Sequence, residues 1–395
     1  MIAREKDIPY GSKGYPFLGP PCHPVTVSPT CAKKNKGSLS ENIDNPLLTS
    51  PRVDVIQGNT IALFFLVMAA GGYGRPCERT VTLRGKPAGE GRPGRKMRAR
   101  AASPFPEPFM QYKETQMNTR GFSLVREERL SEVSGTVKLW RHDATGAELL
   151  SIVNNDENKC FGATFRTPPK DSTGVAHILE HSVLCGSEKY PVKEPFVELL
   201  KGSLQTFLNA FTFPDKTCYP VASANLQDFY NLVDVYLDAV FFPRIDENCF
   251  QQEGWHIEAD SPAGPLRYKG VVFNEMKGVY SSPDSVLAEH SQQSLFPDMT
   301  YGLDSGGNPE VIPQLTYKAF KSFHESHYHP SNTRFFFWGD DPEEQRFALL
   351  EPYLSRFTAR ETDSAVPLQP RLDVPRQLEF PYASGEDGDK GHVTL

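Results

Sequence analysis

The composition of the chain changes near residue 104, and this change limits where a hydrophobic core can form. Residues 1–104 are rich in Pro, Gly, Ser and Arg and show no sustained hydrophobic period of 2 or 3.6 residues. From Pro106 onward, apolar residues recur at the spacing of strands and helices. We therefore predict a disordered leader over residues 1–104 and a folded body that begins at residue 105 of the 395 residues.

The charge of the chain divides at the same place. Residues 1–104 contain 16 Lys and Arg against 7 Asp and Glu, a balance of +9, and the rest contains 26 against 42, a balance of −16. An acidic body does not favour nucleic acid, whose phosphates need Lys and Arg. Long-range electrostatics would instead attract cationic partners to it. We expect no nucleic-acid partner.

The leader has the composition of a targeting segment. Arg75 to Arg100 contains nine basic residues opposed by only two glutamates, and small residues follow. Arg-rich, acid-poor stretches are typical of organelle transit peptides. Residues 68–103 are therefore predicted to be one, with Met68 as an alternative start. The expected location is the mitochondrial matrix, with the plastid stroma as the alternative. A plain disordered tail is the competing interpretation.

Simple counts argue against a membrane-spanning protein, a disulfide scaffold and a Cys-type zinc module. The longest apolar run, Ile61 to Ala70, has ten residues, whereas a membrane span needs about 20, so no membrane span is expected. The seven cysteines are scattered and form no CxxC pair, which argues against a disulfide scaffold and against a Cys-type zinc module. A reducing compartment is the simpler interpretation.

The body alternates predicted strands and helices, which indicates an α+β fold with a mixed β-sheet packed against helices. Leu226 to Val240 has the clearest helical spacing of apolar residues. Strands are expected over Gly121 to Leu139, Ala147 to Val153, Cys160 to Arg166 and Thr333 to Trp338, a hairpin over Gln205 to Val221, and helices over Thr173 to Leu184, Glu194 to Leu200, Val271 to Val279, Thr316 to His327 and Pro342 to Phe357.

The motif with the most chemical content is His177-Ile178-Leu179-Glu180-His181. His177 and His181 are four residues apart, so on a helix both imidazoles project from one face, as two zinc ligands must. Glu180 lies on the same turn and could deprotonate a water molecule. This H-x-x-E-H order is a metallopeptidase signature. The competing interpretation is a pair of surface histidines beside an acid.

A catalytic zinc site needs a third protein ligand, because three ligands leave one position open for water. Position alone does not choose among the candidates, although Glu275 lies where an apolar strand runs into a helix. The histidines near residue 327 are interpreted as structural. The candidates are Glu253, Glu258, Glu275, Glu289, His290 and the cluster His324, His327 and His329.

The run from Gly174 to Ala222, which contains this motif, resembles the inverted-zincin metallopeptidase family M16 of pitrilysin and insulin-degrading enzyme, and within it the presequence protease branch. The resemblance covers about residues 106–357. Supporting stretches are Val235 to Pro243, Gln252 to Trp255, Gly270 to Gly278, Ser305 to Leu315 and His327 to Trp338.

The resemblance implies a role for each site residue. His177, His181 and Glu275 would bind zinc, one ion per chain, and Glu180 would be the general base. The Asn209-Ala210 segment matches the edge-strand segment that pairs with the substrate backbone.

The resemblance also implies a longer architecture of four related α/β domains in two halves. Residues 105–357 would be the zinc peptidase domain, 358–376 a linker and 377–395 the start of a truncated second domain, with a strand opening at Gly391. A missing C-terminal half is therefore an expected partner, and we expect little activity from this chain alone.

The expected function is a zinc metallo-oligopeptidase, a metalloendopeptidase that degrades unfolded peptides such as cleaved organelle targeting peptides. Glu180 would take the proton of a zinc-bound water as that water attacks the peptide carbonyl. Basic targeting peptides suit the acidic body. The alternatives are a presequence-cleaving subunit of the mitochondrial processing peptidase type, and a catalytically incompetent fragment that folds and binds zinc.

Two further features are given ordinary interpretations. Asp304 to Gly307 imitates the nucleophile loop of a serine protease, but no His and Asp in a β-barrel pattern accompany it. Cys185 follows His181 by four residues, and we interpret it as a buried, inert thiol.

Overall fold

A computed structural model describes residues 119–193, 195–382, 391 and 393–394 of the chain. The predicted leader over 1–104, with its transit segment over 68–103, lies outside the described residues. Within the described part, every helix is too short or too polar to cross a bilayer.

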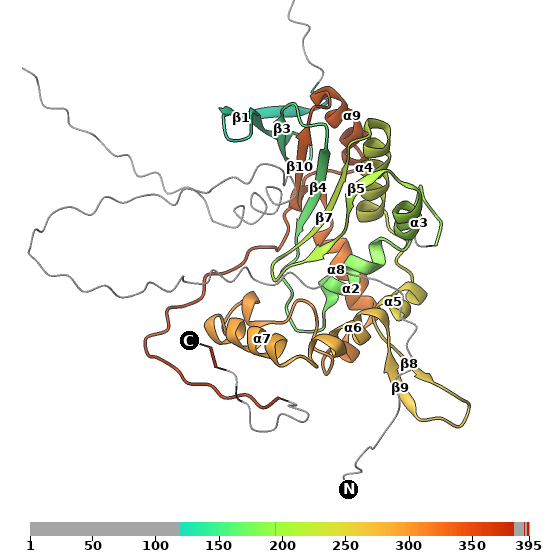
Figure 1. The fold of residues 1–395 in the computed structure, drawn as a ribbon, viewed down its shortest axis with the longest axis vertical. Helices are drawn as coiled ribbons and strands as arrows, with labels where there is room; N and C mark the ends of the chain where they lie inside the picture. Colours follow the sequence, from blue (N-terminus) through green and yellow to red (C-terminus); the bar gives the residue numbers. More distant parts are fainter. Residues whose placement is uncertain (1–118, 194, 383–390, 392, 395) are drawn as a thin grey trace, which may run out of the picture. The chain divides into compact units, whose positions relative to one another are not determined.

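An 8-stranded mixed sheet forms the centre of the fold (Figure 1). Its strand order is β1-β2-β3-β10-β4-β7-β5, and β6 pairs with β7 beside β5. Neighbouring strands are antiparallel, apart from the parallel pair of β3 and β10. The strands are β1 (Phe122–Leu130), β2 (Gly135–His142), β3 (Glu148–Val153), β4 (Lys159–Arg166), β5 (Gln205–Leu208), β6 (Phe211–Thr212), β7 (Lys216–Ser223) and β10 (Thr333–Gly339).

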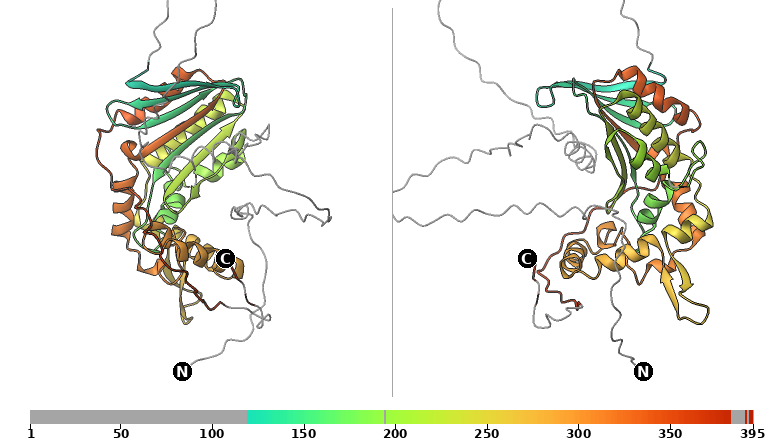
Figure 2. Two further views of the ribbon diagram at one scale, coloured as in Figure 1. Left: turned by 90° about the vertical axis from the view of Figure 1, so that its left-hand side faces the viewer. Right: turned by 45° about the vertical axis from the view of Figure 1, so that its right-hand side comes forward.

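Two helices, α4 (Leu226–Phe241) and α9 (Glu343–Leu354), pack together over one face of this sheet (Figure 2). The side chain of Asn225 accepts a hydrogen bond from the backbone N–H of Asp228 and so caps the start of α4. The described part contains further helices and one separate hairpin. They are α2 (Val175–Val183), α3 (Pro195–Gly202), α5 (Glu247–Glu253), the hairpin β8 (His256–Ala259) and β9 (Leu266–Lys269), α6 (Val271–Val279), α7 (Pro283–Leu295) and α8 (Tyr317–His327).

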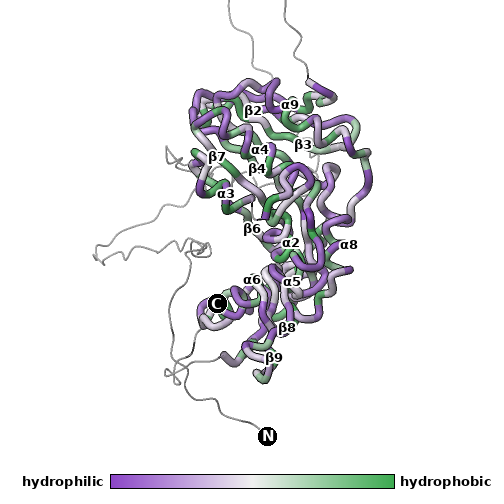
Figure 3. The backbone as a smooth tube through the Cα atoms, turned by 90° about the vertical axis from the view of Figure 1, so that its right-hand side faces the viewer, coloured by the Kyte–Doolittle hydropathy of each residue, from purple (hydrophilic) through white to green (hydrophobic). Residues whose placement is uncertain are grey.

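Strand β10 shows how the core is divided. Phe335 and Phe337 join the main hydrophobic cluster, whereas Phe336 and Trp338 join a smaller cluster on the other face of the sheet. This alternation follows from the two-residue period of a strand. Hydrophobic stretches accordingly concentrate in the sheet and in the helices packed against it (Figure 3).

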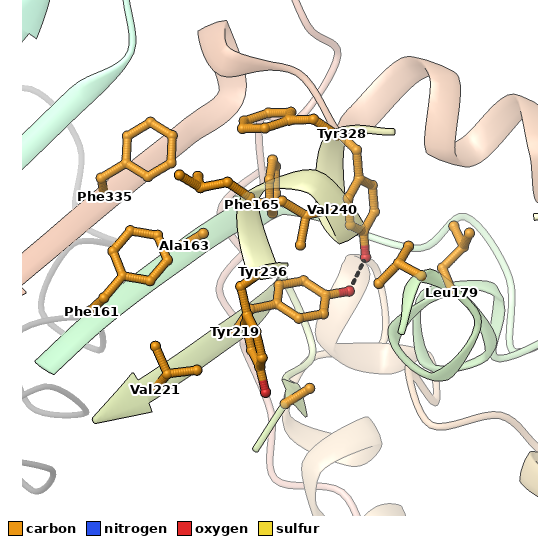
Figure 4. Close-up of a cluster of buried hydrophobic side chains, with 14 of the residues drawn as sticks. Phe161, Ala163, Phe165, Leu179, Tyr219, Val221, Tyr236, Val240, Tyr328 and Phe335 are labelled. Atoms are coloured by element: carbon orange, nitrogen blue, oxygen red, sulfur yellow. Dashed lines mark hydrogen bonds between the residues drawn. The ribbon is translucent and has the colours of Figure 1, made fainter. Parts of the chain in front are cut away.

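Aromatic side chains join the sheet to the helix that carries the motif. Phe165 of β4 stacks on Tyr328, and the hydroxyl of Tyr328 hydrogen-bonds that of Tyr219 at 2.7 Å (Figure 4). Leu179 of α2 lies beside this pair. Burying an aromatic or leucine side chain contributes roughly 1.5–3 kcal/mol, so this layer fixes α2 firmly against the sheet.

The α+β class is confirmed, and the strands and helices predicted in the body are present, apart from the strand expected just before Glu275. The run Val271 to Phe273 is helical from its first residue, so that expected strand is wrong and the predicted helix over Val271 to Val279 is confirmed. Residues 358–376, where a linker is predicted, contain no helix or strand. A strand is expected to begin at Gly391, but the described residues 391, 393 and 394 are not in a strand. Three features were not predicted, namely α5, α7 and the β8–β9 hairpin.

Candidate metal centre

Helix α2, which carries the H-x-x-E-H motif, is largely buried in the fold. Val175, Ile178, Leu179 and Val183 are buried against neighbouring elements, so their apolar face fixes the direction in which the histidines point. The helix begins after Gly174, which has a φ of +69° and provides no side-chain cap.

The side chains of His177, His181 and Glu275 converge on one point. One ligand atom from each lies within 4.8 Å of the other two. The Nε2 atoms of both histidines are 3.8 Å from Oε2 of Glu275. Tetrahedral metal bonds of about 2.0–2.2 Å place ligand atoms roughly 3.3–3.6 Å apart. The three side chains therefore lie close to the spacing that a tetrahedral metal needs.

The far nitrogens of both rings have acceptors of their own. Nδ1 of His177 is 2.9 Å from the carbonyl oxygen of Gly306, and Nδ1 of His181 is 3.4 Å from a carboxylate oxygen of Glu253. A carbonyl oxygen can only accept, so Nδ1 of His177 carries the hydrogen. A neutral ring then presents the lone pair of Nε2 toward Glu275, which is the form of histidine that binds a metal.

This donor set fits zinc. Two imidazole lone pairs and a carboxylate that face one another repel unless a cation lies between them. A set of two histidines and one glutamate is a known arrangement for catalytic zinc. The side chain of Glu275 is 33% exposed, so the site is open on one side.

Electrostatics at the site favour positive charge. Burial by itself lowers the pKa of His181, but its hydrogen bond to Glu253 and the charges of Glu180 and Glu275 outweigh burial and raise it. Burial raises the pKa of Glu253, but the same bond to His181 lowers it overall. Carboxylates therefore surround the imidazoles and would stabilise a cation there.

Glu180 lies on the same turn of α2, and its carboxylate is buried. Its Oε2 accepts a hydrogen bond of 2.6 Å from the hydroxyl of Thr212 in β6. Burial, with a contribution from the Glu180 charge, raises the pKa values of Tyr219 and Tyr236 well above their ordinary value. These phenols stay protonated beneath the carboxylate.

Asn209 and Ala210 connect β5 to β6 at the last position in the sheet order. The backbone of Asn209 faces inward, because its N–H donates to the carbonyl of Pro220 at 3.3 Å. Pro220 has no N–H to return, and the carbonyl of Asn209 accepts from the hydroxyl of Tyr236 at 3.2 Å instead. Since adjacent residues of a strand face opposite sides, Leu208, the last residue of β5, presents its backbone groups to the outer edge. The N–H of Ala210 instead donates to Oδ1 of Asn209 at 2.9 Å.

The remaining candidates for the third ligand lie elsewhere. Glu253 contacts the far side of the His181 ring, and Glu258 pairs with Lys269 in the β8–β9 hairpin. Burial, and then the charge of Asp304, raise the pKa of Glu289 to about 7. The ring of His290 stacks on Phe380. The cluster near residue 327 is buried, and its members are His324, His327 and His329.

Cys185 lies beside Glu253, the acceptor behind the His181 ring. Its Sγ contacts Oε1 of Glu253 at 3.6 Å and is partly buried. A hydrogen bond with Cys249, together with burial, raises the pKa of the Cys185 thiol, which keeps it protonated as expected for an unreactive cysteine.

The groups that support the site were the part missed from the sequence. The sequence gives Thr212 no role, offers Glu253 only as a candidate ligand, and places Gly306 in a serine-protease-like loop and in a stretch of the family resemblance. The one sequence signal for Gly306 is that it lies in the Ser305 to Leu315 stretch of the family resemblance, but the resemblance implies no role for any residue of that stretch.

The sequence model described as Insulinase (Peptidase family M16) matches residues 162–276, which include the H-x-x-E-H motif and Glu275. The model described as Peptidase M16 inactive domain matches residues 314–395.

Several curated relatives are similar over the body of the chain. Presequence protease 1, chloroplastic/mitochondrial, of Arabidopsis thaliana is 59% identical over 273 residues, covering 68% of this chain and 25% of the relative. Presequence protease, mitochondrial, of Danio rerio is 52% identical, covering 60% and 23%. Protein HypA of Clostridium perfringens is 50% identical, covering 72% and 29%. The chain spans about a quarter of the length of these relatives.

The names of the two presequence proteases agree with the predicted location, the mitochondrial matrix with the plastid stroma as the alternative. Among solved structures, pitrilysin is similar with a TM-score of 0.46 and 20% identity, covering 65% of this chain and 26% of pitrilysin.

Proposed function

Because the chain belongs to the presequence protease branch of peptidase family M16, we propose that it supplies the zinc-dependent catalytic site of a metalloendopeptidase. His177, His181 and Glu275 hold one zinc ion in this proposal, and Glu180 is the general base. The observation that carries it is the convergence of three ligand atoms within 4.8 Å, with Nδ1 of both histidines engaged on their far sides.

The chemistry divides between the metal and the protein. A zinc ion at this site would supply Lewis-acid activation of a water molecule and of a peptide carbonyl. The carboxylate of Glu180, adjacent in sequence to His181, takes the proton of that water and passes it to the leaving amine. Thr212 orients this carboxylate through its hydrogen bond to Oε2.

Unfolded peptides are the proposed substrates, bound as an added strand along the β5–β6 edge. Thr212 belongs to β6 and contacts Glu180, so a peptide paired at this edge passes beside the general base. Strand addition recognises the backbone and needs little side-chain specificity. The −16 balance of residues 105–395 favours basic peptides, and cleaved targeting peptides are basic and unfolded.

Relatives about four times as long as this chain bear the name presequence protease. We therefore propose that efficient turnover needs residues corresponding to the rest of those relatives, which would act as the partner of this catalytic part. A folded, zinc-binding chain without activity is the second candidate, and the same length difference favours it.

Peptide hydrolysis tests the proposal. The chain is assayed against a basic, unstructured peptide, both alone and mixed with the remaining C-terminal part of the Arabidopsis thaliana relative. Cleavage is expected in the mixture, with loss on chelation and in Glu180→Gln, whose amide cannot accept the proton. Glu258→Gln, which changes an exposed acid of the β8–β9 hairpin, is the matched control and should keep activity.

Cleavage that persists at a normal rate in Glu180→Gln would remove this residue from the base role. A mixture that binds zinc but never cleaves would favour the non-catalytic alternative.

A further inference from the structure

One buried carboxylate organises the loop behind the His177 ring. Asp304 is 7% exposed, and its Oδ1 accepts hydrogen bonds from the backbone N–H groups of Gly306 at 2.9 Å and Gly307 at 3.2 Å. Its Oδ2 accepts from the hydroxyl of Tyr280 at 2.7 Å. A buried carboxylate is costly unless such donors surround it, and here three donors do.

The loop that Asp304 holds is the one that contacts the metal centre. The carbonyl of Gly306 accepts from Nδ1 of His177 at 2.9 Å. The two amides bound by Asp304 belong to Gly306 itself and to the next peptide unit, so the carboxylate fixes the orientation of this carbonyl. If the Gly306 carbonyl pointed elsewhere, its contact with Nδ1 would no longer favour the His177 tautomer that has its hydrogen on Nδ1 and its lone pair on Nε2.

Close backbone packing presses the same loop against the start of α2. A Cβ atom on Gly174 would lie 2.7 Å from the carbonyl oxygen of Gly306, and Gly307 has a φ of +106°. Ser172 adds two bonds, since its Oγ accepts from the N–H of Asp304 and its carbonyl from the N–H of Asn308. These backbone contacts hold the loop in place on one side, and the Asp304 side chain holds it on the other.

Tyr280 connects the same carboxylate to the third ligand. It caps the C-terminus of α6, the helix that carries Glu275. Burial, followed by the charge of Asp304, raises the pKa of Tyr280, so its hydroxyl remains a donor. Asp304 thus contacts both the loop that orients His177 and the helix that positions Glu275.

We propose that Asp304 is a positioning residue of the metal centre, which holds the Gly306 carbonyl against His177 and the end of α6 against the same loop. The inference rests on the proposed zinc site and assigns to it a residue that lies outside the ligands and the base. Removal of groups that orient metal ligands typically weakens metal binding 10–100-fold.

The test measures zinc affinity of the full chain by competition with a chromophoric chelator, and the visible spectrum of the Co²⁺-substituted protein. Asp304→Ala should weaken zinc binding about 10–100-fold and alter the cobalt spectrum. Asp304→Asn should restore most of the affinity, because its amide oxygen still accepts from both glycine N–H groups. Tyr280→Phe should give a smaller loss.

Asp341→Ala is the structural control. Asp341 is 2% exposed and pairs with the buried Arg346 beside β3, in a separate network. It should lower the thermal midpoint without changing zinc affinity or the cobalt spectrum.

Wild-type affinity in Asp304→Ala, or an equal loss of affinity in Asp341→Ala, would overturn the inference. If the wild-type chain itself fails to bind zinc, the proposed function falls and the positioning role falls with it. Normal zinc binding and hydrolysis in both the wild type and Asp304→Ala would overturn the positioning role alone.

Discussion

At the scale of single residues, the two histidines are oriented by different kinds of acceptor. A neutral backbone carbonyl faces Nδ1 of His177, and the carboxylate of Glu253 faces Nδ1 of His181. A carboxylate both orients the ring and makes its other nitrogen a stronger ligand. The contribution of Glu253 to zinc affinity should therefore have two parts, one from orienting the His181 ring and one from its negative charge.

Glu253→Gln keeps an acceptor for His181 but loses the charge, so zinc should bind about 10-fold more weakly, and Glu253→Ala should approach the 100-fold end of the usual range. Chelator competition measures both values. Glu258→Gln, which changes an exposed acid on the neighbouring hairpin, is the control and should bind zinc as the wild type does. Equal affinities in all four proteins would show that Glu253 does not support the site.

At the scale of elements, the β5–β6 edge determines how a peptide could bind. Asn209 turns its backbone inward to Pro220 and Tyr236, whereas the backbone groups of the preceding residue, Leu208, face outward. A peptide paired at this edge would likewise use the backbone groups of every second residue.

N-methylation of a substrate peptide tests this alternation, because it removes one backbone donor without changing a side chain. Peptides methylated at one set of alternate residues should inhibit weakly, whereas those methylated at the intervening residues should inhibit like the parent peptide. Inhibition constants against the active mixture are the measurement. Equal weakening by both sets would contradict binding as an added strand.

The elements that the sequence predicted are those with strong periodicity. Helix α4 buries an unbroken apolar face, and α2 carries apolar residues beside the motif. Helix α7 buries no residue, α5 is seven residues long, and the β8–β9 hairpin exposes Ile257 and Leu266. Because these elements are short or bury few apolar residues, the sequence contains no periodic apolar pattern from which they could be predicted.

The candidate site, too, could be predicted from the sequence only where residue types form a recognisable pattern. The motif marks His177, Glu180 and His181, and the family resemblance marks Glu275. The support from Gly306 comes from a backbone carbonyl, which every residue possesses, and therefore has no signature in side-chain types. Asp304 acts only because the fold brings its loop, 127 residues further along the chain, to His177.

At the scale of the whole molecule, buried histidines away from the metal centre couple stability to pH. Burial lowers the pKa of His324 to about 4, against the opposing hydrogen bond to the Val240 carbonyl and with a smaller contribution from the Arg360 guanidinium. Burial and Arg360 also lower the pKa of His329 to about 4. Both imidazoles are therefore neutral in the folded protein at pH values where the unfolded chain takes up protons.

Stability should accordingly be highest above pH 6.5 and fall as the pH falls toward 4, by on the order of 3 kcal/mol for His324 alone. In His324→Gln, whose amide can still donate to Val240, the free energy of unfolding should depend less steeply on pH in this window. Urea unfolding at several pH values measures the slope. An unchanged slope in the variant would show that His324 is not a source of the acid sensitivity.

The zinc content of the purified chain tests the central claim most directly. Elemental analysis should find one zinc per chain in the wild type and in Glu180→Gln, because the proposed base is not a ligand. His177→Ala, His181→Ala and Glu275→Ala should each lose most of the metal. Stoichiometric zinc in both histidine variants would contradict the assignment of this metal centre.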